Sequence, residues 1–270
     1  MIRGYLKQLD ARSGIRMRRI IAFLTLLRRV HKRGSYYSRS IFCVPEKKLL
    51  YLSVSKAGNT SIKAALYALP ETDDYRTIHA DVRKIGENRR ATEIVNYPDY
   101  DSFTFVRNPL ERLVSCYENK FHSDKASVGR TIRTLIYDRY LLGFLAKDRG
   151  FRNFARRVCL IPDRNADRHF ASQSMNALDA DGKIIVDYVG KFENFADDFE
   201  TLRRRFDLAP LPHYNKTKKS GRNWMDYYDL KTAKRVYQRY RTDIAVFGYQ
   251  DAYDALIDYL KAKEHPPHDD

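Results

Sequence analysis

The sequence predicts an α/β fold with a central parallel sheet flanked by helices. Short apolar, strand-like runs alternate with segments of helical periodicity along the chain, which favours helices on both faces of such a sheet. The 270 residues, 43% of them hydrophobic, are enough to bury one substantial core. Two strand-to-helix junctions also carry groups that bind anions, and parallel α/β sheets bind ligands beyond the carboxyl ends of their strands.

The elements and domains follow from the same periodicities. Strands are predicted at residues 41–44, 49–54, 103–106 and 184–189. Helices are predicted at residues 60–69, 81–95, 109–122, 130–147, 194–206, 226–240 and 251–262. Residues 123–182 carry few strand signals and are predicted to form a helical insertion. We divide the chain into a basic N-terminal arm (1–40), a single large domain (41–262) and a disordered tail (263–270).

The first junction follows the apolar run 49–54, where the loop Lys56-Ala57-Gly58-Asn59-Thr60-Ser61 leads into a helical pattern. Backbone N–H groups at a helix N-terminus bind phosphate or sulfate, Gly58 permits close approach, and Lys56 adds a positive charge. The loop is not a Walker A motif, because G-x-x-x-x-G-K-[ST] is absent. The alternative is an ordinary strand–turn–helix with Thr60 as the N-cap.

The second junction follows the strand-like run 103–106. Arg107 stands at the turn, Asn108 is a suitable N-cap, and Pro109 suits the first helical position. The helical pattern predicts a buried stripe of Leu110, Leu113, Val114 and Tyr117, with Glu111, Arg112 and Ser115 on more polar faces. Arg107 can hold an anion in bidentate fashion, with the Ser115 hydroxyl nearby. The alternative is a surface arginine and a solvated serine.

Together the two junctions resemble the donor-binding motifs of sulfotransferases that use 3′-phosphoadenosine 5′-phosphosulfate (PAPS). The R-x-P-x-E-R-x-x-S wording of residues 107–115 is closest to the Golgi carbohydrate O-sulfotransferases and their bacterial relatives, the sulfotransferase family 2-like proteins. The resemblance continues through residues 169–173, 189–195, 213–217 and 243–249, and so spans roughly residues 42 to 250. Ser55 and Ser172 depart from it, since many relatives have proline at these two positions.

The resemblance implies a P-loop-like sulfotransferase fold and a set of donor contacts. The loop Lys56–Ser61 would bind the 5′-phosphosulfate, with Lys56 stabilising charge on the leaving oxygen. Arg107 and Ser115 would bind the 3′-phosphate, and the product would be adenosine 3′,5′-bisphosphate. A basic stretch with Lys216 and Lys218 would close over the nucleotide, unless it is only a solvated loop. The acceptor would be a hydroxyl of a carbohydrate or glycoconjugate, such as a glycolipid or polysaccharide.

The group that takes the acceptor proton stays open. His79, between the two donor motifs, is the first candidate, because some glycan sulfotransferases place a catalytic histidine in this interval. His79 could instead cap a helix or satisfy a buried carbonyl. His169 is the second candidate and would border the acceptor pocket together with Gln173. Glu193 could serve as base or bind the acceptor, or it could pair with Lys191 or Arg203. The scheme needs no metal, and no carboxylate cluster that would hold one is visible.

Charge is unevenly placed along the chain. The formal net charge is +16, and residues 1–40 hold eleven Lys or Arg against one Asp, a net +10 that leaves +6 for the other 230 residues. Two other classes of protein remain as alternatives: an ATP-using P-loop-like kinase and a basic nucleic-acid-binding protein. The missing Walker A lysine position argues against the first, and the absence of a nucleic-acid-binding signature argues against the second.

Within the basic arm, residues 20–27 form an apolar run between Arg18-Arg19 and Arg28-Arg29. A spanning helix needs about 20 apolar residues, so the run is too short to cross a bilayer, and no signal-peptide cleavage site follows it. It is either an interfacial helix on an anionic membrane or a helix that packs on the body or on a second subunit. We expect a cytoplasmic enzyme, with peripheral contact at the inner face of a membrane as the open alternative.

Three cysteines, Cys43, Cys116 and Cys159, form neither a C-x-x-C pair nor an even set. This argues against a disulfide framework and against a zinc site. Cys43 and Cys116 fall inside predicted elements and are expected to be small core residues. We therefore expect a reducing compartment. The particular acceptor, the hydroxyl that is modified and the oligomeric state are not determined by these patterns.

Overall fold

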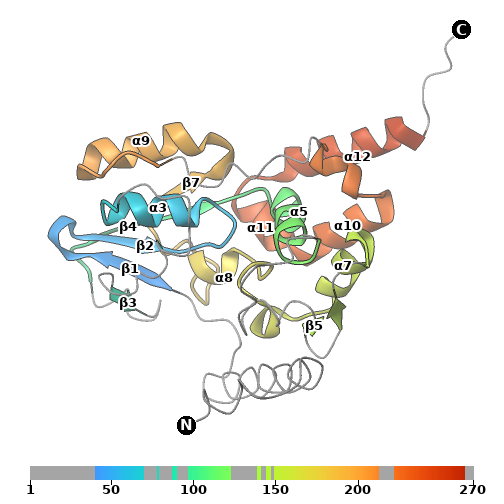
Figure 1. Ribbon diagram of the computed structural model, residues 1–270, viewed down its shortest axis with the longest axis horizontal. Helices are drawn as coiled ribbons and strands as arrows, with labels where there is room; N and C mark the ends of the chain where they lie inside the picture. Colours follow the sequence, from blue (N-terminus) through green and yellow to red (C-terminus); the bar gives the residue numbers. More distant parts are fainter. Residues whose placement is uncertain are drawn as a thin grey trace, which may run out of the picture.

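A computed structural model gives the arrangement of the strands and helices (Figure 1). It describes residues 40–69, 78, 87–89, 97–122, 139–140, 144–146, 149–212 and 222–264. For residues 87–89, 139–140 and 146 only the backbone is considered. The N-terminal arm, apart from residue 40, and the tail beyond residue 264 lie outside the described residues.

A five-stranded mixed sheet forms the centre of the fold. In spatial order its strands are β3 (Glu87–Arg89), β1 (Ile41–Val44), β2 (Leu49–Leu52), β4 (Asp101–Val106) and β7 (Tyr188–Lys191). β2, β4 and β7 run parallel, whereas β1 is antiparallel to both of its neighbours. The predicted α/β class is confirmed, but β1 is not parallel. A single 3-10 turn, η1 (Pro45–Lys47), separates β1 from β2, and so short a connection allows only an antiparallel hairpin.

Both faces of the sheet are covered. Figure 1 shows α3 (Asn59–Leu66) and α9 (Phe195–Phe206) together on one face. Side chains alternate along β1 and β2, so that Phe42 and Tyr51 pack into the cluster with α3 and α9, while Ile41 and Leu50 pack on the other side. All eight residues of these two strands are buried, as expected for strands between two layers.

A second layer, made of helices, lies beyond the carboxyl ends of the parallel strands. It contains α5 (Pro109–Lys120), α7 (Phe151–Val158), α10 (Leu230–Arg239) and α12 (Gln250–Glu264), with η6 (Trp224–Tyr227). Leu113 of α5, Phe154 of α7, Val236 of α10 and Leu256 of α12 belong to one buried cluster. Two shorter helices, α8 (Ser174–Ala177) and α11 (Arg241–Val246), lie against the end of β4 at Val106. These two helices therefore lie beside the carboxyl end of β4.

A capping signal correctly predicted where α5 begins, whereas the start of α10 differs from the prediction. The Asn108 side chain accepts the N–H of Leu110 at 3.0 Å, with proline at the first helical position of α5. The Asp229 side chain accepts the N–H of Thr232 at 2.7 Å, so α10 begins after this residue and not at 226 as predicted. The predicted buried stripe of α5 is also confirmed.

Three predicted elements differ from the structure, each because strand pairing or a contact with another segment decides the conformation. Residues 87–89, predicted helical, pair with β1 as strand β3. β5 (Arg139–Tyr140) and β6 (Leu145–Ala146) form a two-stranded sheet inside the predicted helix 130–147. The last strand begins at Tyr188 and not at 184, since Asp187 is held by the N–H and hydroxyl of Ser102, both at 2.7 Å. The expected helical insertion is represented by α7, η4 (Asp163–Asn165) and α8.

Candidate anion-binding active site

The loop between β2 and α3 turns through two residues of positive φ, Lys56 at 74° and Gly58 at 73°. No larger residue fits at position 58, because a Cβ there would lie 2.4 Å from Cζ of Phe195 at the start of α9. Gly58 is also the N-cap of α3, and no described side chain caps that helix. The first backbone N–H groups of α3 therefore suit an anion, which the N-terminus of a helix favours.

The other residues of this loop differ in how far they reach the surface. Of the six residues predicted to bind the donor, Ala57 and Ser61 are buried and the other four are half-buried. Oδ1 of Asn59 accepts the hydroxyl of Ser53 at 2.8 Å. This side chain thus ties the loop to the end of β2, and Thr60, which was considered as the N-cap, is not one.

Arg107 lies directly beside this loop. Because β4 runs parallel to β2, the two strands end at the same edge of the sheet. Nη1 of Arg107 donates to the backbone oxygen of Lys56 at 3.4 Å, and Nη2 forms an ion pair with Oε1 of Glu111 at 2.7 Å. The guanidinium carbon also lies 4.6 Å from the ring centroid of Phe192. The two sequence motifs are therefore brought together around one cation.

Gln173 holds the backbone of Arg107 in place. Its Oε1 accepts the Arg107 N–H at 2.9 Å, and its Nε2 donates to the Arg107 carbonyl at 2.7 Å. Gln173 is 0% exposed and both ends of its amide are engaged. It offers no surface to an acceptor, which differs from the acceptor-binding role that we expected. Its contacts make it a positioning residue for Arg107.

Glu193 performs a similar task one residue further along the chain. One of its oxygens accepts the N–H of Asn108 at 2.7 Å, and the other accepts the hydroxyl of Tyr249 at 2.9 Å. Burial and the adjacent carboxylate raise the pKa of Tyr249, so the phenol stays protonated and donates. Arg203, one ion-pair partner considered for Glu193, pairs instead with Glu200 at 2.6 Å. Glu193 thus holds the start of α5 against the residue that precedes α12.

Arg112 was predicted on a polar face but is only 2% exposed. Its guanidinium donates to three backbone carbonyls: Ser55 at 2.9 Å, Ala171 at 2.9 Å and Arg168 at 3.1 Å. Hydrogen bonds to three carbonyls satisfy a buried guanidinium that would otherwise be costly to desolvate. Arg112 therefore joins the loop after β2 to the segment that carries His169.

Lys56 is held in an environment that disfavours its charge. Burial lowers the pKa of its ammonium group to about 7, and the nearby cations Lys120, Arg107 and Arg112 lower it further. Cys116 lies close by, but burial raises the pKa of its thiol to about 12, so it carries no compensating charge near neutral pH. An anion bound at this loop would supply the missing counter-charge.

His169 is oriented by a carboxylate that the sequence analysis missed. Nδ1 of His169 lies 2.5 Å from Oδ1 of Asp167, which also accepts the backbone N–H of His169 at 2.9 Å. Although burial opposes it, the contact with His169 keeps the pKa of Asp167 well below its usual range. Burial lowers the pKa of His169 to about 4, so the imidazole is neutral at pH 7. Asp167 then accepts the Nδ1 proton, and Nε2 is the basic nitrogen.

A carboxylate also anchors the segment that follows this pair. Asp243 in α11 is fully buried and accepts the N–H groups of Gln173 at 2.8 Å and Ser174 at 2.9 Å. Burial raises its pKa. Asp167 and Asp243 gave no sequence signal beyond the D-x-H spacing of the first and the place of the second in the segment 243–249.

The remaining predicted site residues are only partly described. Ser115 is half-buried and lies one turn beyond Glu111 on the same face of α5. His79, Lys216 and Lys218 lie outside the described residues. Within the part of the chain that is described, no group of three or more His, Cys, Asp or Glu side chains could hold a metal ion. None of the three cysteines forms a disulfide, and Cys43 and Cys116 are buried as predicted.

Comparison with known proteins adds the family. A family model described as "Sulfotransferase family" matches residues 39–250. Carbohydrate sulfotransferase 12 of Xenopus laevis is 24% identical over 203 residues, which are 68% of this chain and 48% of that protein. Carbohydrate sulfotransferase 8 of Homo sapiens is 26% identical over 238 residues, 82% of this chain and 54% of that protein. Carbohydrate sulfotransferase 10 of Xenopus laevis is 26% identical over 249 residues, 78% and 67% respectively.

The chain therefore spans about half to two thirds of the length of these curated relatives. No solved structure matches it significantly. The expected cytoplasmic location is contradicted by the similarity to these carbohydrate sulfotransferases. The reducing compartment inferred from the cysteines stays a prediction. Among the described residues no helix is long and apolar enough to cross a membrane, and the apolar run 20–27 is not among them.

Proposed function

We propose that this chain, which belongs to the sulfotransferase family, transfers a sulfuryl group from PAPS to a hydroxyl of a carbohydrate. The observation that carries the proposal is the 3.4 Å contact between the Arg107 guanidinium and the backbone of Lys56. A donor with phosphate at both ends of its ribose needs two anion sites a short distance apart. An arginine beside a helix N-terminus at the carboxyl ends of two parallel strands offers such a pair.

On the donor side, the backbone N–H groups at the start of α3 and the ammonium group of Lys56 would hold the 5′-phosphosulfate. The donor supplies the sulfuryl group. Arg107 and the Ser115 hydroxyl would hold the 3′-phosphate, and this phosphate would compete with Glu111 for the guanidinium. Protonated Lys56 would stabilise the charge that develops on the leaving oxygen. Lys216 and Lys218 remain candidates for the rim of this site.

On the acceptor side, the hydroxyl oxygen bonds to sulfur as the bond from sulfur to the 5′-phosphate oxygen breaks, and adenosine 3′,5′-bisphosphate leaves. The hydroxyl proton passes to a base. The hydrogen bond with Asp167 supports His169 in this role, because it leaves Nε2 as the basic nitrogen. His79 remains the other candidate. We infer that Gln173 and Glu193 act as positioning residues, since each holds the backbone at the turn before α5.

The test is thermal unfolding with adenosine 3′,5′-bisphosphate, ADP or AMP, for wild type, Arg107→Ala and the exposed control Arg156→Ala. At about 100 times its dissociation constant, a ligand stabilises the fold by roughly 2.7 kcal/mol. For a chain of this size that shift corresponds to roughly 5–10 °C. We expect it with the bisphosphate, in wild type and Arg156→Ala only.

An equal response to ADP would mean that the site does not select a 3′-phosphate, and would contradict the proposal. The absence of any nucleotide response would contradict it as well. A full response in Arg107→Ala would show that the assignment of the 3′-phosphate site is wrong while leaving the donor itself in place.

A further inference from the structure

The loop that carries His169 has little regular structure of its own. Residues 163–172 contain the short η4 and otherwise neither a helix nor a strand. We call this stretch the histidine loop. Its two ends meet, since Oδ1 of Asp163 accepts the backbone N–H of Ser172 at 2.8 Å. Because no ladder of backbone hydrogen bonds runs through the loop, side chains from other elements must fix its position.

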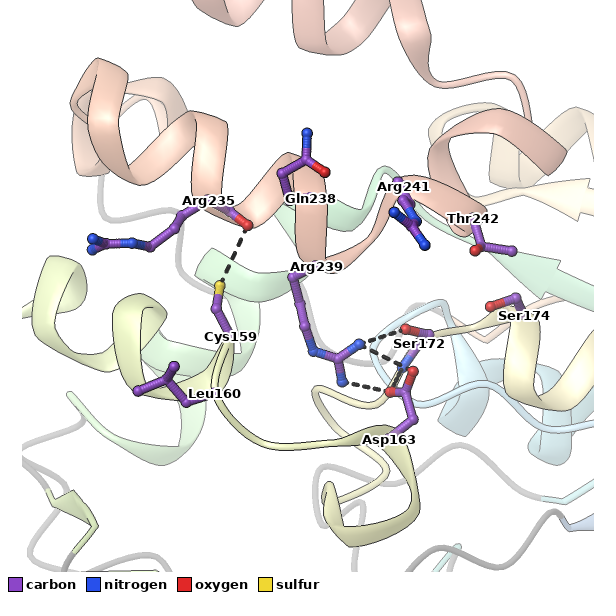
Figure 2. A pocket seen from close by; sticks show the side chains of 10 residues that line it. All are labelled: Cys159, Leu160, Asp163, Ser172, Ser174, Arg235, Gln238, Arg239, Arg241 and Thr242. Carbon is purple, nitrogen blue, oxygen red and sulfur yellow. Dashed lines mark hydrogen bonds and ion pairs between the residues drawn. The ribbon is translucent and has the colours of Figure 1, made fainter.

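Arg239, the last residue of α10, joins both ends of the histidine loop (Figure 2). Its Nη1 donates to Oδ2 of Asp163 at 3.0 Å and to the hydroxyl of Ser172 at 2.9 Å, and its Nη2 pairs with Oδ1 of Asp163 at 2.5 Å. A guanidinium that engages both oxygens of a carboxylate fixes direction as well as distance. The Arg239 side chain is only 9% exposed, so solvent screens the pair little. Although burial opposes it, Arg239 keeps the pKa of Asp163 below its usual value, so the carboxylate stays ionised.

The residues that follow Arg239 extend this hold. The hydroxyl of Tyr240 donates to the carbonyl of Phe170 at 2.6 Å, inside the histidine loop. Asp243 accepts the N–H of Gln173 at 2.8 Å, directly after the loop. The corner between α10 and α11 therefore contacts the loop at its ends, in its interior and just beyond it. Since Gln173 has its own anchor, the residue that positions the donor-site arginine does not depend on Arg239.

A second helix holds the histidine loop from the side of the donor site. Arg112 of α5 donates to the carbonyls of Arg168 and Ala171, on either side of His169, and also to the carbonyl of Ser55. Ser55 directly precedes the donor loop, so one guanidinium connects the two loops. With Arg112 fixing the middle of the histidine loop, the ends are left to the corner between α10 and α11. A shift of these ends would move the His169 ring relative to the donor loop.

We propose that Arg239 is a positioning residue for proton transfer: by closing the histidine loop, it fixes the pair Asp167 and His169 relative to the donor loop. This inference rests on the proposed function, in which His169 takes the acceptor proton. Without Arg239 the ends of the loop separate, and the contact between Asp167 and Nδ1 of His169 weakens. The imidazole is then free to adopt either tautomer. The donor site is retained, because Asp243 still holds Gln173.

The first test records the ring signals of ¹⁵N-labelled histidine in the free protein near neutral pH. The signals of His169 are assigned by their absence in His169→Gln. The variants are Arg239→Gln and Arg239→Lys. Because Arg239 lines a cavity of about 480 Å³ (Figure 2), a shorter side chain has room there. The matched control is Leu202→Ala, which creates a cavity in the buried cluster of α3 and α9, a cluster that contains no residue of the histidine loop. Thermal unfolding compares the stability of all variants.

In wild type and Leu202→Ala we expect a single neutral tautomer of His169, with the proton on Nδ1. In Arg239→Gln we expect a mixture of both tautomers. Arg239→Lys keeps a charged donor and should restore most of the Nδ1 form. The wild-type signal in Arg239→Gln would overturn the proposal, as would the same mixture in Leu202→Ala or in wild type.

The second test measures turnover with a panel of carbohydrates and the thermal shift induced by adenosine 3′,5′-bisphosphate. In Arg239→Gln kcat should fall by about 10–100-fold while the bisphosphate shift stays unchanged. Loss of both would indicate general damage to the site and would overturn the proposal, as would an unchanged kcat. If wild type shows neither turnover nor bisphosphate binding, but Arg239→Gln still mixes the tautomers, the proposed function is rejected and Arg239 remains the residue that orients His169.

Discussion

The chemistry of the site depends most on Lys56. It combines a positive φ of 74°, burial, and the proximity of other cations, and all of these are unfavourable for a free lysine side chain. Since its pKa of about 7 is below the usual 10.5, the unfolded chain binds more protons between these two values. The stability of the unliganded protein should therefore rise with pH over that window. Anion binding reverses the preference, because it favours the protonated form.

The first prediction follows from this reversal. Affinity for adenosine 3′,5′-bisphosphate should fall by up to about tenfold per pH unit between pH 7 and 9, as Lys56 must take up a proton on binding. Titration calorimetry in buffers of different ionisation enthalpy measures both the affinity and the proton uptake. Lys56→Arg, which stays charged throughout, should bind with little dependence on pH. The same slope in both proteins would assign the titration to another group.

The second prediction concerns His169. If Nε2 takes the acceptor proton, His169→Gln should lower kcat by about 10²–10⁴-fold. The bisphosphate-induced thermal shift should stay unchanged, because the imidazole is not part of the donor site. Turnover is measured by release of adenosine 3′,5′-bisphosphate with a panel of carbohydrates. His79→Gln is the comparison, and a large loss of kcat in this variant alone would transfer the base role to His79.

At the scale of elements, the site is held by contacts between segments that are distant in the sequence. Phe195 at the start of α9 packs against Gly58 at the start of α3, so the two helices on one face of the sheet meet at the loop. The guanidinium of Arg112 in α5 donates hydrogen bonds to the carbonyls of Ser55 and Ala171. The anion loop therefore owes its shape to α5 and α9 as well as to its own residues.

Gly58→Ala tests the contact with α9. The new Cβ would meet the Phe195 ring at 2.4 Å in a backbone conformation of positive φ. We expect a loss of about 2–4 kcal/mol in the free energy of unfolding, together with loss of bisphosphate binding. Gly182→Ala is the control, because Gly182 has a φ of 81° but nothing within 4 Å of a Cβ. Urea unfolding should show a clearly smaller loss of stability for Gly182→Ala. Equal losses in the two variants would mean that the contact with Phe195 does not contribute.

Arg112→Met tests the hydrogen bonds from α5. The substitution leaves three carbonyls without their donor, and each buried unsatisfied group costs about 1–3 kcal/mol. We therefore expect a loss of about 3 kcal/mol or more in urea unfolding. The exposed control Arg156→Met should change stability by less than about 0.5 kcal/mol. A neutral Arg112→Met would mean that the loop does not depend on this side chain.

At the scale of the whole molecule, the charge distribution favours the approach of anions. The net charge is +16, of which +10 lies in residues 1–40 and +6 in the rest of the chain, and the donor product is anionic. A field of one sign accelerates association, and salt screens it over about 10 Å at 0.1 M and about 3 Å at 1 M.

Stopped-flow association of a fluorescent adenosine 3′,5′-bisphosphate should therefore slow by at least about tenfold between 0.05 and 0.5 M NaCl. Binding of uncharged adenosine, if it is measurable, should not slow. An association rate for the bisphosphate that is independent of salt would mean that the electrostatic field of the net charge does not act at the site.

Several features of the site could be predicted from the sequence because they depend on neighbouring residues. The Asn108 cap and Pro109 define the start of α5, Gly58 allows the turn before α3, and both junctions that are proposed to bind anions follow parallel strands as expected. Such signals act over a few residues, where the backbone and the nearest side chains decide the conformation. The N-terminal arm, His79 and the basic stretch with Lys216 and Lys218 stay predictions, since they lie outside the described residues.

Only the tertiary structure decided how the polar side chains around the site are used. Helical periodicity placed Arg112 on a polar face, and Gln173 and Glu193 were candidates for contact with the acceptor. Each of these side chains is instead engaged with the backbone of a segment between 56 and 85 residues away. The strand at residues 87–89 likewise depends on pairing with β1. The sequence by itself determined the two strand-to-helix junctions that are proposed to bind anions, because their conformation depends on neighbouring residues. The partners that hold those loops were decided by packing, because a buried polar group takes whichever donor or acceptor the fold brings within reach.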